Sequence, residues 1–176
     1  MLKFNDLILL ILLNSTLNFA QHYEKLNFLL IIADDLNCAI GAYGDPLADT
    51  PNINRLAQEG VLFTNAHVQY PLCSPSRVSF MTGLYPDQTK SKELRLHVRQ
   101  TIPDVITLGQ KFRMENYHSI RVGKVYHYHN PRDIGTASYD DMYTWDRTVN
   151  PYGRDKIEGH KTVSYTHLRA HETSVD

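Results

Sequence analysis

The sequence predicts an α/β fold in which a mostly parallel sheet is flanked by helices. A mostly apolar run over residues 26–33 has the length and composition of a strand buried on both faces of such a sheet. A helix follows, with Thr50 as N-cap, Pro51 at its first position and Gly60 at its end. The next apolar run, over residues 61–66, is typical of a second strand. The order strand, helix, strand indicates a parallel βαβ unit.

The middle of the chain begins with a loop that leads into a helix. Two prolines within residues 70–75 prevent regular strand pairing there, so we expect a loop. A helix is expected to begin at Pro75 or Ser76 and to end at Gly83. Residues 86–104 are polar and have no clear period, and we expect them to be irregular.

The remaining elements alternate again between helix and strand. A helix is expected over about residues 104–115, and a short strand over residues 117–122 that ends at Gly123. Residues 128–162 are rich in Tyr, Asp, Asn, Pro and Gly. We interpret them as loops over a site and not as core.

Composition excludes several classes of protein. The 176 residues carry 18 basic and 19 acidic side chains, a net charge of −1. A nucleic-acid or anionic-membrane binder would show a basic excess, so neither partner is expected. Two cysteines are too few for a disulfide scaffold or a Cys-rich zinc site.

The two ends of the chain differ from its middle. Residues 1–20 contain Lys3, a seven-residue apolar run over residues 7–13 and Ala20, which together indicate a signal peptide. The alternative for this run is a buried core strand or helix. The run is shorter than the ~20 apolar residues that span a bilayer, so we expect an exported protein, periplasmic or extracellular, without a membrane anchor. Residues 163–176 resemble translated adaptor sequence and are interpreted as a non-native tail.

The segment that most strongly suggests a functional site is Cys73-Ser74-Pro75-Ser76-Arg77. Cys73 precedes a predicted helix N-terminus, where free N–H groups and the helix dipole favour anions. Arg77, one turn later, supplies a planar cation that suits an oxyanion. The residues alone leave two interpretations open: an activated nucleophile at an anion pocket, or an inert buried cysteine near a surface arginine.

Other segments of the chain resemble a known family together with this motif, and the resemblance favours the first interpretation, an activated nucleophile. Cys73-x-Pro75-x-Arg77 followed by Thr82-Gly83 resembles the signature of the type I sulfatases, whose cysteine is converted to Cα-formylglycine. The segments that also resemble this family are Ile32-Ala33-Asp34-Asp35, Thr50-Pro51-Asn52-Ile53, Gly60 to Ala66 and Val122 to His127. The last of them is most similar to the iduronate-2-sulfatase-like branch. The resemblance implies an alkaline-phosphatase-like fold, of which residues 21–162 are expected to be the N-terminal part.

The resemblance also implies a role for each candidate residue. Asp34 and Asp35, with the converted Cys73, are expected to hold one divalent cation, Ca²⁺. The catalytic residues are expected to be Cys73, Arg77, Lys124 and His127: a formylglycine hydroxyl attacks sulfur, Arg77 and Lys124 contact the sulfate, and His127 holds or deprotonates the aldehyde hydrate. The expected partners are a sulfated carbohydrate substrate and a formylglycine-generating enzyme.

Each of these residues also has a structural alternative. Asp35 could cap a strand end, Lys124 could be a solvated strand end, and His127 could be a structural histidine. His127 and His129 imitate a zinc pair, but no third ligand is evident. Cys38 is expected to be a small buried residue; a disulfide to Cys73 is open after export, although the sulfatase interpretation forbids it.

The chain departs from the family pattern in its length. Further metal ligands and a lysine acting on the leaving group lie downstream in the family, so we expect this fragment alone to be inactive. Two alternative functions stay open. One is a phosphodiesterase or phosphonate hydrolase of the alkaline-phosphatase superfamily, some of which use the same C-x-P-x-R motif. The other is a non-catalytic, exported polysaccharide-binding remnant.

Overall fold

The computed structural model describes residues 25–159, which divide into two units, residues 25–36 and residues 37–159. The predicted signal peptide and the predicted non-native tail both lie outside the described residues. Among the described helices, none has the length and apolar character needed to cross a membrane.

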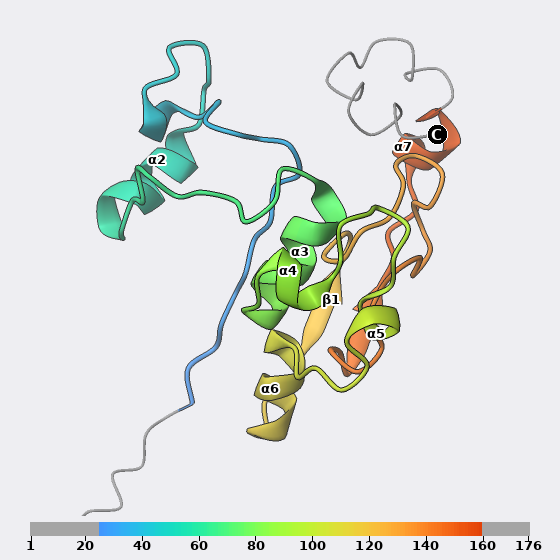
Figure 1. Cartoon of the computed structure of the whole chain (residues 1–176). Helices are drawn as coiled ribbons and strands as arrows, with labels where there is room; N and C mark the ends of the chain where they lie inside the picture. The colour runs from blue at the N-terminus through green and yellow to red at the C-terminus, as the bar shows by residue number, and fades with distance from the viewer. Residues whose placement is uncertain (1–24, 160–176) are drawn as a thin grey trace, which may run out of the picture. The chain divides into compact units, whose positions relative to one another are not determined.

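The first unit is an extended segment without helix or strand (Figure 1). The predicted strand over residues 26–33 is therefore wrong for this structure. Leu29 is 86% exposed and Ile31 is 77% exposed. A strand needs hydrogen-bonded neighbours, and the sheet of the described residues consists of two strands outside this segment. The apolar run thus has the composition of a buried strand without the sheet that would bury it.

The second unit begins with a 3₁₀-helix, η1 (Gly41–Tyr43), and the helix α2 (Pro51–Glu59), which contact each other. The predicted limits of α2 are confirmed, with Thr50 at the N-cap and Gly60 at the C-cap. The Thr50 hydroxyl does not cap the helix; it accepts a hydrogen bond from the Gly41 amide and donates one to Asn54 Oδ1. That hydroxyl therefore joins η1 to α2.

No residue of α2 is buried, although its apolar side chains share one face, with Leu56 65% exposed. The predicted strand over residues 61–66 is absent, and Val61 and Phe63 are exposed. The predicted βαβ unit is therefore wrong for the described residues. Apolar side chains leave water only where other elements cover them, and here no described element does.

Three helices follow, and two of them occupy the region predicted to be irregular. They are α3 (Cys73–Thr82), α4 (Pro86–Thr89) and α5 (Val98–Thr101). Helix α3 packs against α4. The four-residue helices α4 and α5 are too short to show a helical period, which explains why the pattern of residues 86–104 does not reveal them.

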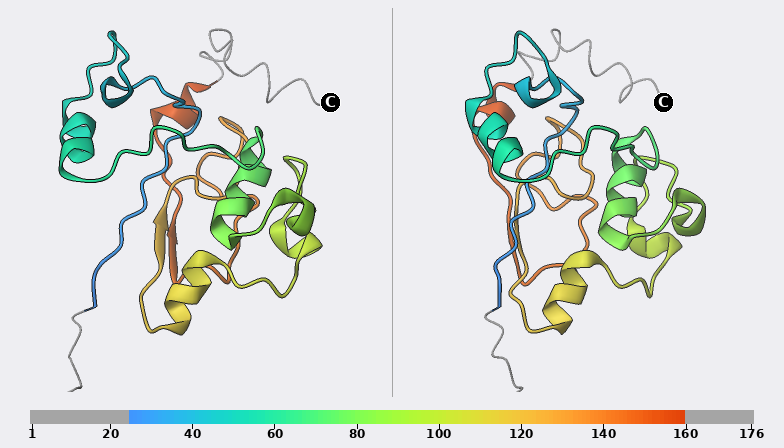
Figure 2. Two further views of the ribbon diagram at one scale, coloured as in Figure 1. Left: turned by 60° about the vertical axis from the view of Figure 1, so that its left-hand side comes forward. Right: turned by 90° about the vertical axis from the view of Figure 1, so that its left-hand side faces the viewer.

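The last elements form the sheet and its flank. They are α6 (Leu108–Met114), β1 (Ile120–Val122), β2 (Arg147–Val149) and α7 (Arg154–Ile157). Strands β1 and β2 run side by side (Figure 2). They are parallel, and their register places Arg121 opposite Thr148. Helix α6 contacts α3. The predicted helix and strand here are confirmed with shorter limits, and β2 was not predicted.

The core is a small cluster of Val78, Met81, Val98 and Tyr126. Ile134, Asp141 and Thr144, which belong to the segment interpreted as loops, are also buried. The expectation that residues 128–162 contribute no core is therefore wrong for the part that the structure describes. These side chains are mostly polar, so they are buried through hydrogen bonds that a hydrophobic pattern does not reveal.

Helix α6 approaches this buried segment very closely at Gly109. A Cβ atom at this position would lie 2.6 Å from Thr144 Cγ2 and 2.6 Å from the Thr144 carbonyl oxygen. Real side chains do not tolerate such distances to backbone atoms, so only glycine fits. Gly109 therefore sets the distance between α6 and the segment around Thr144.

Candidate active site

Cys73 is the first residue of α3 and not, as predicted, a loop residue ahead of it. Pro75 is tolerated in this first turn because the first amides of a helix have no partner within the helix. The N-cap Leu72 makes no side-chain hydrogen bond to these amides. Cys73 is partly exposed. It therefore lies at the helix end that carries partial positive charge.

Arg77 lies one turn after Cys73 and is 5% exposed. Its Nη1 donates hydrogen bonds to the carbonyl oxygens of Val125 at 2.8 Å and of Lys124 at 3.3 Å. Arg77 thus joins the C-x-P-x-R helix to the second predicted motif, 47 residues further along the chain.

That second motif leaves β1 through Gly123, whose φ of 75° lies in the left-handed region. Glycine reaches this conformation at no steric cost. Lys124 follows, partly buried, with Nζ 5.6 Å from the centre of the Tyr128 ring. An ammonium group at this distance is attracted by the face of the ring. The side chain of Lys124 is therefore not simply a solvated strand end.

His127 is 2% exposed and packs among aromatic rings. The centre of its ring lies 4.9 Å from that of His129, in an edge-to-face arrangement. The Tyr139 ring lies 6.3 Å away and is inclined by only 24°. This packing is compatible with both sequence interpretations, a catalytic histidine held in place or a structural one.

A buried polar network that the sequence did not suggest contacts Tyr126, which lies between Lys124 and His127 in the chain. Asp141 is fully buried and accepts hydrogen bonds from Arg99 Nε at 3.0 Å and Nη2 at 2.9 Å, and from Thr144 Oγ1 at 2.6 Å. Burial raises the pKa of Asp141, but the hydrogen bonds from Arg99 and Thr144 outweigh it and hold the pKa below its usual value. Burial also raises the pKa of Tyr126, whose hydroxyl lies 3.2 Å from Thr144 Oγ1.

A second buried pair lies next to this network. Arg121 and Asp140 form an ion pair in which both side chains are less than one tenth exposed. Sequence reasoning missed this pair and the Arg99–Asp141 pair. A signal was present, since an arginine inside a three-residue strand and two consecutive aspartates downstream are costly unless they are paired.

The predicted metal ligands Asp34 and Asp35 belong to the first unit and are exposed. Asp35 has a φ of 52°, a left-handed conformation that aspartate adopts more readily than most residues. Two consecutive carboxylates are oxygen donors suited to a hard divalent cation. Cys73, Arg77, Lys124 and His127 belong to the second unit, so the convergence of both aspartates with these residues stays a prediction.

Cys38 is exposed, so the expectation that it is buried is wrong. It follows the described 25–36 segment in a stretch of turns where no described element covers it. No disulfide joins Cys38 to Cys73. The Cys73 thiol is therefore not part of the disulfide bond that the sulfatase interpretation forbids.

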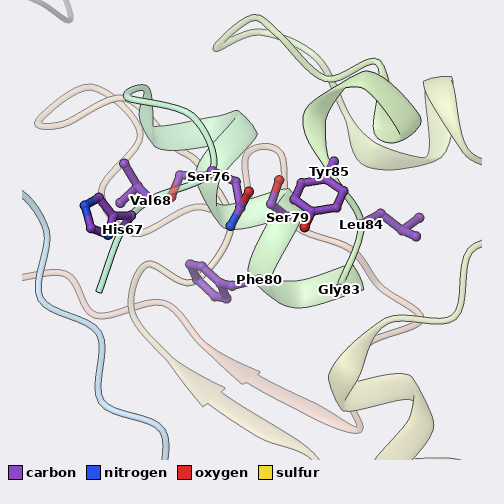
Figure 3. Close-up of a pocket in the computed structure, with 9 residues that line it drawn as sticks. His67, Val68, Ser76, Ser79, Phe80, Gly83, Leu84 and Tyr85 are labelled. Atoms are coloured by element: carbon purple, nitrogen blue, oxygen red, sulfur yellow. The ribbon is translucent and has the colours of Figure 1, made fainter. Parts of the chain in front are cut away.

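A cavity of about 440 Å³ lies along α3, and none of the predicted catalytic residues lines it. Figure 3 shows His67 and Tyr85 at its two ends, with Ser76 and Ser79 of α3 between them. His67 is one of the residues that line this cavity. Within residues 25–159 the buried Ser79 hydroxyl has no hydrogen-bond partner.

Comparison with known proteins identifies relatives. The chain is 40% identical to mouse iduronate 2-sulfatase over 139 residues, 79% of this chain and 25% of the relative. It is 40% identical to a sulfatase of Formosa agariphila over 122 residues, 63% of this chain and 23% of the relative. A Delta 4,5-hexuronate-2-O-sulfatase of Bacteroides thetaiotaomicron is 36% identical over 113 residues, 61% of this chain and 23% of the relative.

The chain spans about a quarter of the length of the curated relatives it matches. The sequence model of the sulfatase family matches residues 26–171. This family has an alkaline-phosphatase-like fold, and the parallel β1–β2 pair with its flanking helices is part of such an architecture. The chain belongs to the sulfatase family and, over four fifths of its length, is similar to iduronate 2-sulfatases.

Proposed function

We propose that the protein hydrolyses sulfate esters and that Cys73, converted to formylglycine, is its nucleophile. The observation that carries the proposal is the C-x-P-x-R motif at the start of α3 in a chain of the sulfatase family. The hydrogen bonds from Arg77 to the backbone of Lys124 and Val125 support it, because they join both predicted catalytic motifs. Formylglycine would supply a hydrated aldehyde. One hydroxyl, deprotonated, would attack sulfur and displace the alcohol of the ester, and deprotonation of the other would then break the carbon–oxygen bond to sulfate, which releases sulfate and regenerates the aldehyde.

Two cations would offset the charge of the sulfate group. Arg77 is buried one turn into α3, and in a site with little water a fixed guanidinium stabilises an anion more than it would in bulk solvent. Lys124 follows the Gly123 reversal, and its long side chain ends in a compact ammonium that can contact a sulfate oxygen. The partial positive charge at the N-terminus of α3 acts in the same direction.

His127 would hold or remove the proton of the aldehyde hydrate. Its ring is buried between His129 and Tyr139, which restricts its orientation. A general base acts only when it lies within hydrogen-bond reach of its proton, so a restricted ring favours this role. The orientation of the His127 imidazole would therefore already be restricted before the reaction begins.

Asp34 and Asp35 would hold a divalent cation, for which Ca²⁺ is the candidate. Their carboxylates provide the hard oxygen ligands that Ca²⁺ and Mg²⁺ take, whereas zinc takes nitrogen and sulfur ligands more often. A bound cation would add positive charge for the sulfate oxygens. Two carboxylates fall short of the six to eight oxygens that Ca²⁺ usually takes, so residues 21–162 alone are expected to bind Ca²⁺ weakly and to lack turnover.

The substrate class follows from the relatives. Iduronate and hexuronate are named in two of them, and both are sugar acids. We therefore propose a sulfated carbohydrate as substrate. The signal-like residues 1–20 support export to a periplasmic or extracellular location, and conversion of Cys73 requires a formylglycine-generating enzyme as partner.

The test is made on the protein that carries the whole sulfatase domain, co-expressed with a maturing enzyme. Peptide mass spectrometry is expected to find formylglycine at position 73, and the purified protein is expected to hydrolyse an aryl sulfate faster than an aryl phosphodiester. Cys73→Ala should abolish turnover without changing the circular-dichroism spectrum. An intact thiol at position 73 beside a converted control sulfatase would contradict the proposal, and faster phosphodiester cleavage would favour the phosphodiesterase alternative.

A further inference from the structure

The chain segment that carries Lys124 is held on both sides by buried side chains to which no role has been given. We propose that Arg121 and Tyr126 are positioning residues for Lys124: Arg121, paired with Asp140, holds the chain before it, and Tyr126 holds the chain after it. This inference rests on the proposed function, because it concerns the lysine proposed to contact the sulfate.

The first anchor is the guanidinium of Arg121, whose side chain is 3% exposed. Its Nε and Nη2 both lie 2.5 Å from Asp140 Oδ2. Its Nη1 donates to the carbonyl oxygen of Gly123 at 2.8 Å. A planar guanidinium serves both acceptors at once in a fixed geometry, which the single ammonium of a lysine does not reproduce.

Asp140 is itself held from two further directions. Trp145 Nε1 donates to its Oδ1 at 2.9 Å, and the His97 ring nitrogen Nε2 lies 2.7 Å from its carbonyl oxygen. The ion pair therefore has fixed partners at both ends and is not a pair of mobile surface charges.

Both backbone groups of Gly123 are used. Its carbonyl accepts from Arg121, and its amide donates to the Val149 carbonyl of β2 at 3.0 Å. With a φ of 75°, Gly123 is the point at which the chain turns away from the sheet. Fixing its amide and its carbonyl fixes the direction in which Lys124 leaves β1.

The second anchor is Tyr126, two residues after Lys124. Its ring is 3% exposed and packs in the core with Val78, Met81 and Val98. Its hydroxyl lies 3.2 Å from Thr144 Oγ1. Thr144 Oγ1 in turn donates its proton to the Asp141 carboxylate. The lone pairs of Thr144 Oγ1 can therefore accept a hydrogen bond from the Tyr126 hydroxyl.

The energetic cost of burying the charged side chain of Arg121 supports a role in the accurate placement of Lys124. Along β1, Arg121 faces the interior whereas Ile120 and Val122 are exposed, the reverse of what burial of apolar surface favours. A buried ion pair often stabilises a protein no more than apolar residues of the same volume would. A displacement of about 1 Å at a catalytic group, in contrast, can lower the rate about 10²-fold.

The test compares Arg121→Lys and Tyr126→Phe with a control, Arg113→Lys. Arg113 pairs with Asp146 at 2.8 Å and donates to the carbonyl oxygen of Tyr143, so its hydrogen bonds in the described part of the chain go to residues other than 123–127. All variants are made in the protein that carries the whole sulfatase domain, and rates are divided by the fraction of formylglycine found by mass spectrometry. Aryl-sulfate kcat and KM and the inhibition constant of inorganic sulfate are measured.

We expect Arg121→Lys to lower kcat by about tenfold or more and to weaken inhibition by sulfate, with Tyr126→Phe acting in the same direction and the control leaving both unchanged. In a Lys124→Ala background, Arg121→Lys should have no further effect on kcat, because its effect acts through that lysine. If Arg121→Lys does not fold, Tyr126→Phe, which removes one hydroxyl only, decides the question.

Two results would overturn the inference. One is wild-type kcat and sulfate inhibition in the folded, matured variants, and the other is an equal effect of Arg121→Lys with and without Lys124. An inactive, fully matured wild type would instead overturn the proposed function, and this inference with it.

Discussion

Replacement of Asp141 by Asn should destabilise the protein strongly, although Asp141 lies outside every motif of the sequence. The side chain is fully buried and accepts three hydrogen bonds, two from Arg99 and one from Thr144. Asparagine keeps the volume but places an NH₂ group where Arg99 or Thr144 donates. It also leaves the Arg99 guanidinium, 15% exposed, without its counter-charge. Loss of one partner of a buried pair costs about 3–5 kcal/mol of unfolding free energy.

The assay is urea unfolding, followed both by circular dichroism and by the fluorescence of the single tryptophan, Trp145. The matched control is Asp87→Asn, which removes an exposed carboxylate from its pair with Lys92 and should leave the unfolding curve unchanged. Coincident transitions from the two signals would justify a two-state treatment.

The loss of unfolding free energy in Asp141→Asn should depend on pH, and the direction of this dependence follows from the pKa of Asp141. The pKa of Asp141 is lower in the folded than in the unfolded protein, so its stabilisation is present above the unfolded pKa and is lost as pH falls. The difference between wild type and Asp141→Asn should therefore be largest near neutral pH and should narrow in acid. A loss below ~1 kcal/mol at pH 7, the size found for exposed pairs, would refute the argument from burial.

Further predictions concern other positions. Gly109→Ala should lower the unfolding free energy by about 1–3 kcal/mol, because its Cβ would overlap Thr144, and an unchanged urea midpoint would contradict this close approach. For Asp133, burial raises the pKa, but hydrogen bonds from the adjacent arginine, a backbone amide and a serine lower it to about 2. Asp133→Asn should therefore reduce the loss of stability between about pH 4 and pH 2 in acid titration. Arg77→Ala should reduce aryl-sulfate kcat/KM by about 10²-fold or more, whereas Arg55→Ala, on the exposed face of α2, should have no effect; equal losses would disprove the role of Arg77.

Local signals in the sequence were sufficient wherever a short stretch of chain determines its own conformation. Pro51 and Gly60 predicted the limits of α2, because the preference of proline for the first turn of a helix and of glycine for its end acts within a few residues. Gly83 and Gly123 marked the end of α3 and of β1 for the same reason, since both adopt positive φ. The resemblance of the C-x-P-x-R motif identified the family, which the comparisons confirm.

Features that depend on distant neighbours could not be predicted in this way. The apolar runs over residues 26–33 and 61–66 have strand composition, but strand pairing is a property of two segments, and neither run is a strand of the sheet in the described residues. Strand β2 has only three residues and is fully exposed, so it has no hydrophobic pattern to reveal it.

The same distinction between local and long-range features applies to the candidate site. The resemblance of short sequence motifs to the sulfatase family predicted roles for Cys73, Arg77, Lys124 and His127, because a motif is a local property of the chain. Tertiary structure alone decided that Arg77 contacts the backbone of Lys124, 47 residues away. It also decided that Arg121 of strand β1 and Arg99 of helix α5 form buried pairs with two consecutive aspartates, Asp140 and Asp141. Burial determines whether a charge is a solvated surface group or a fixed anchor, and burial exists only once the chain has folded.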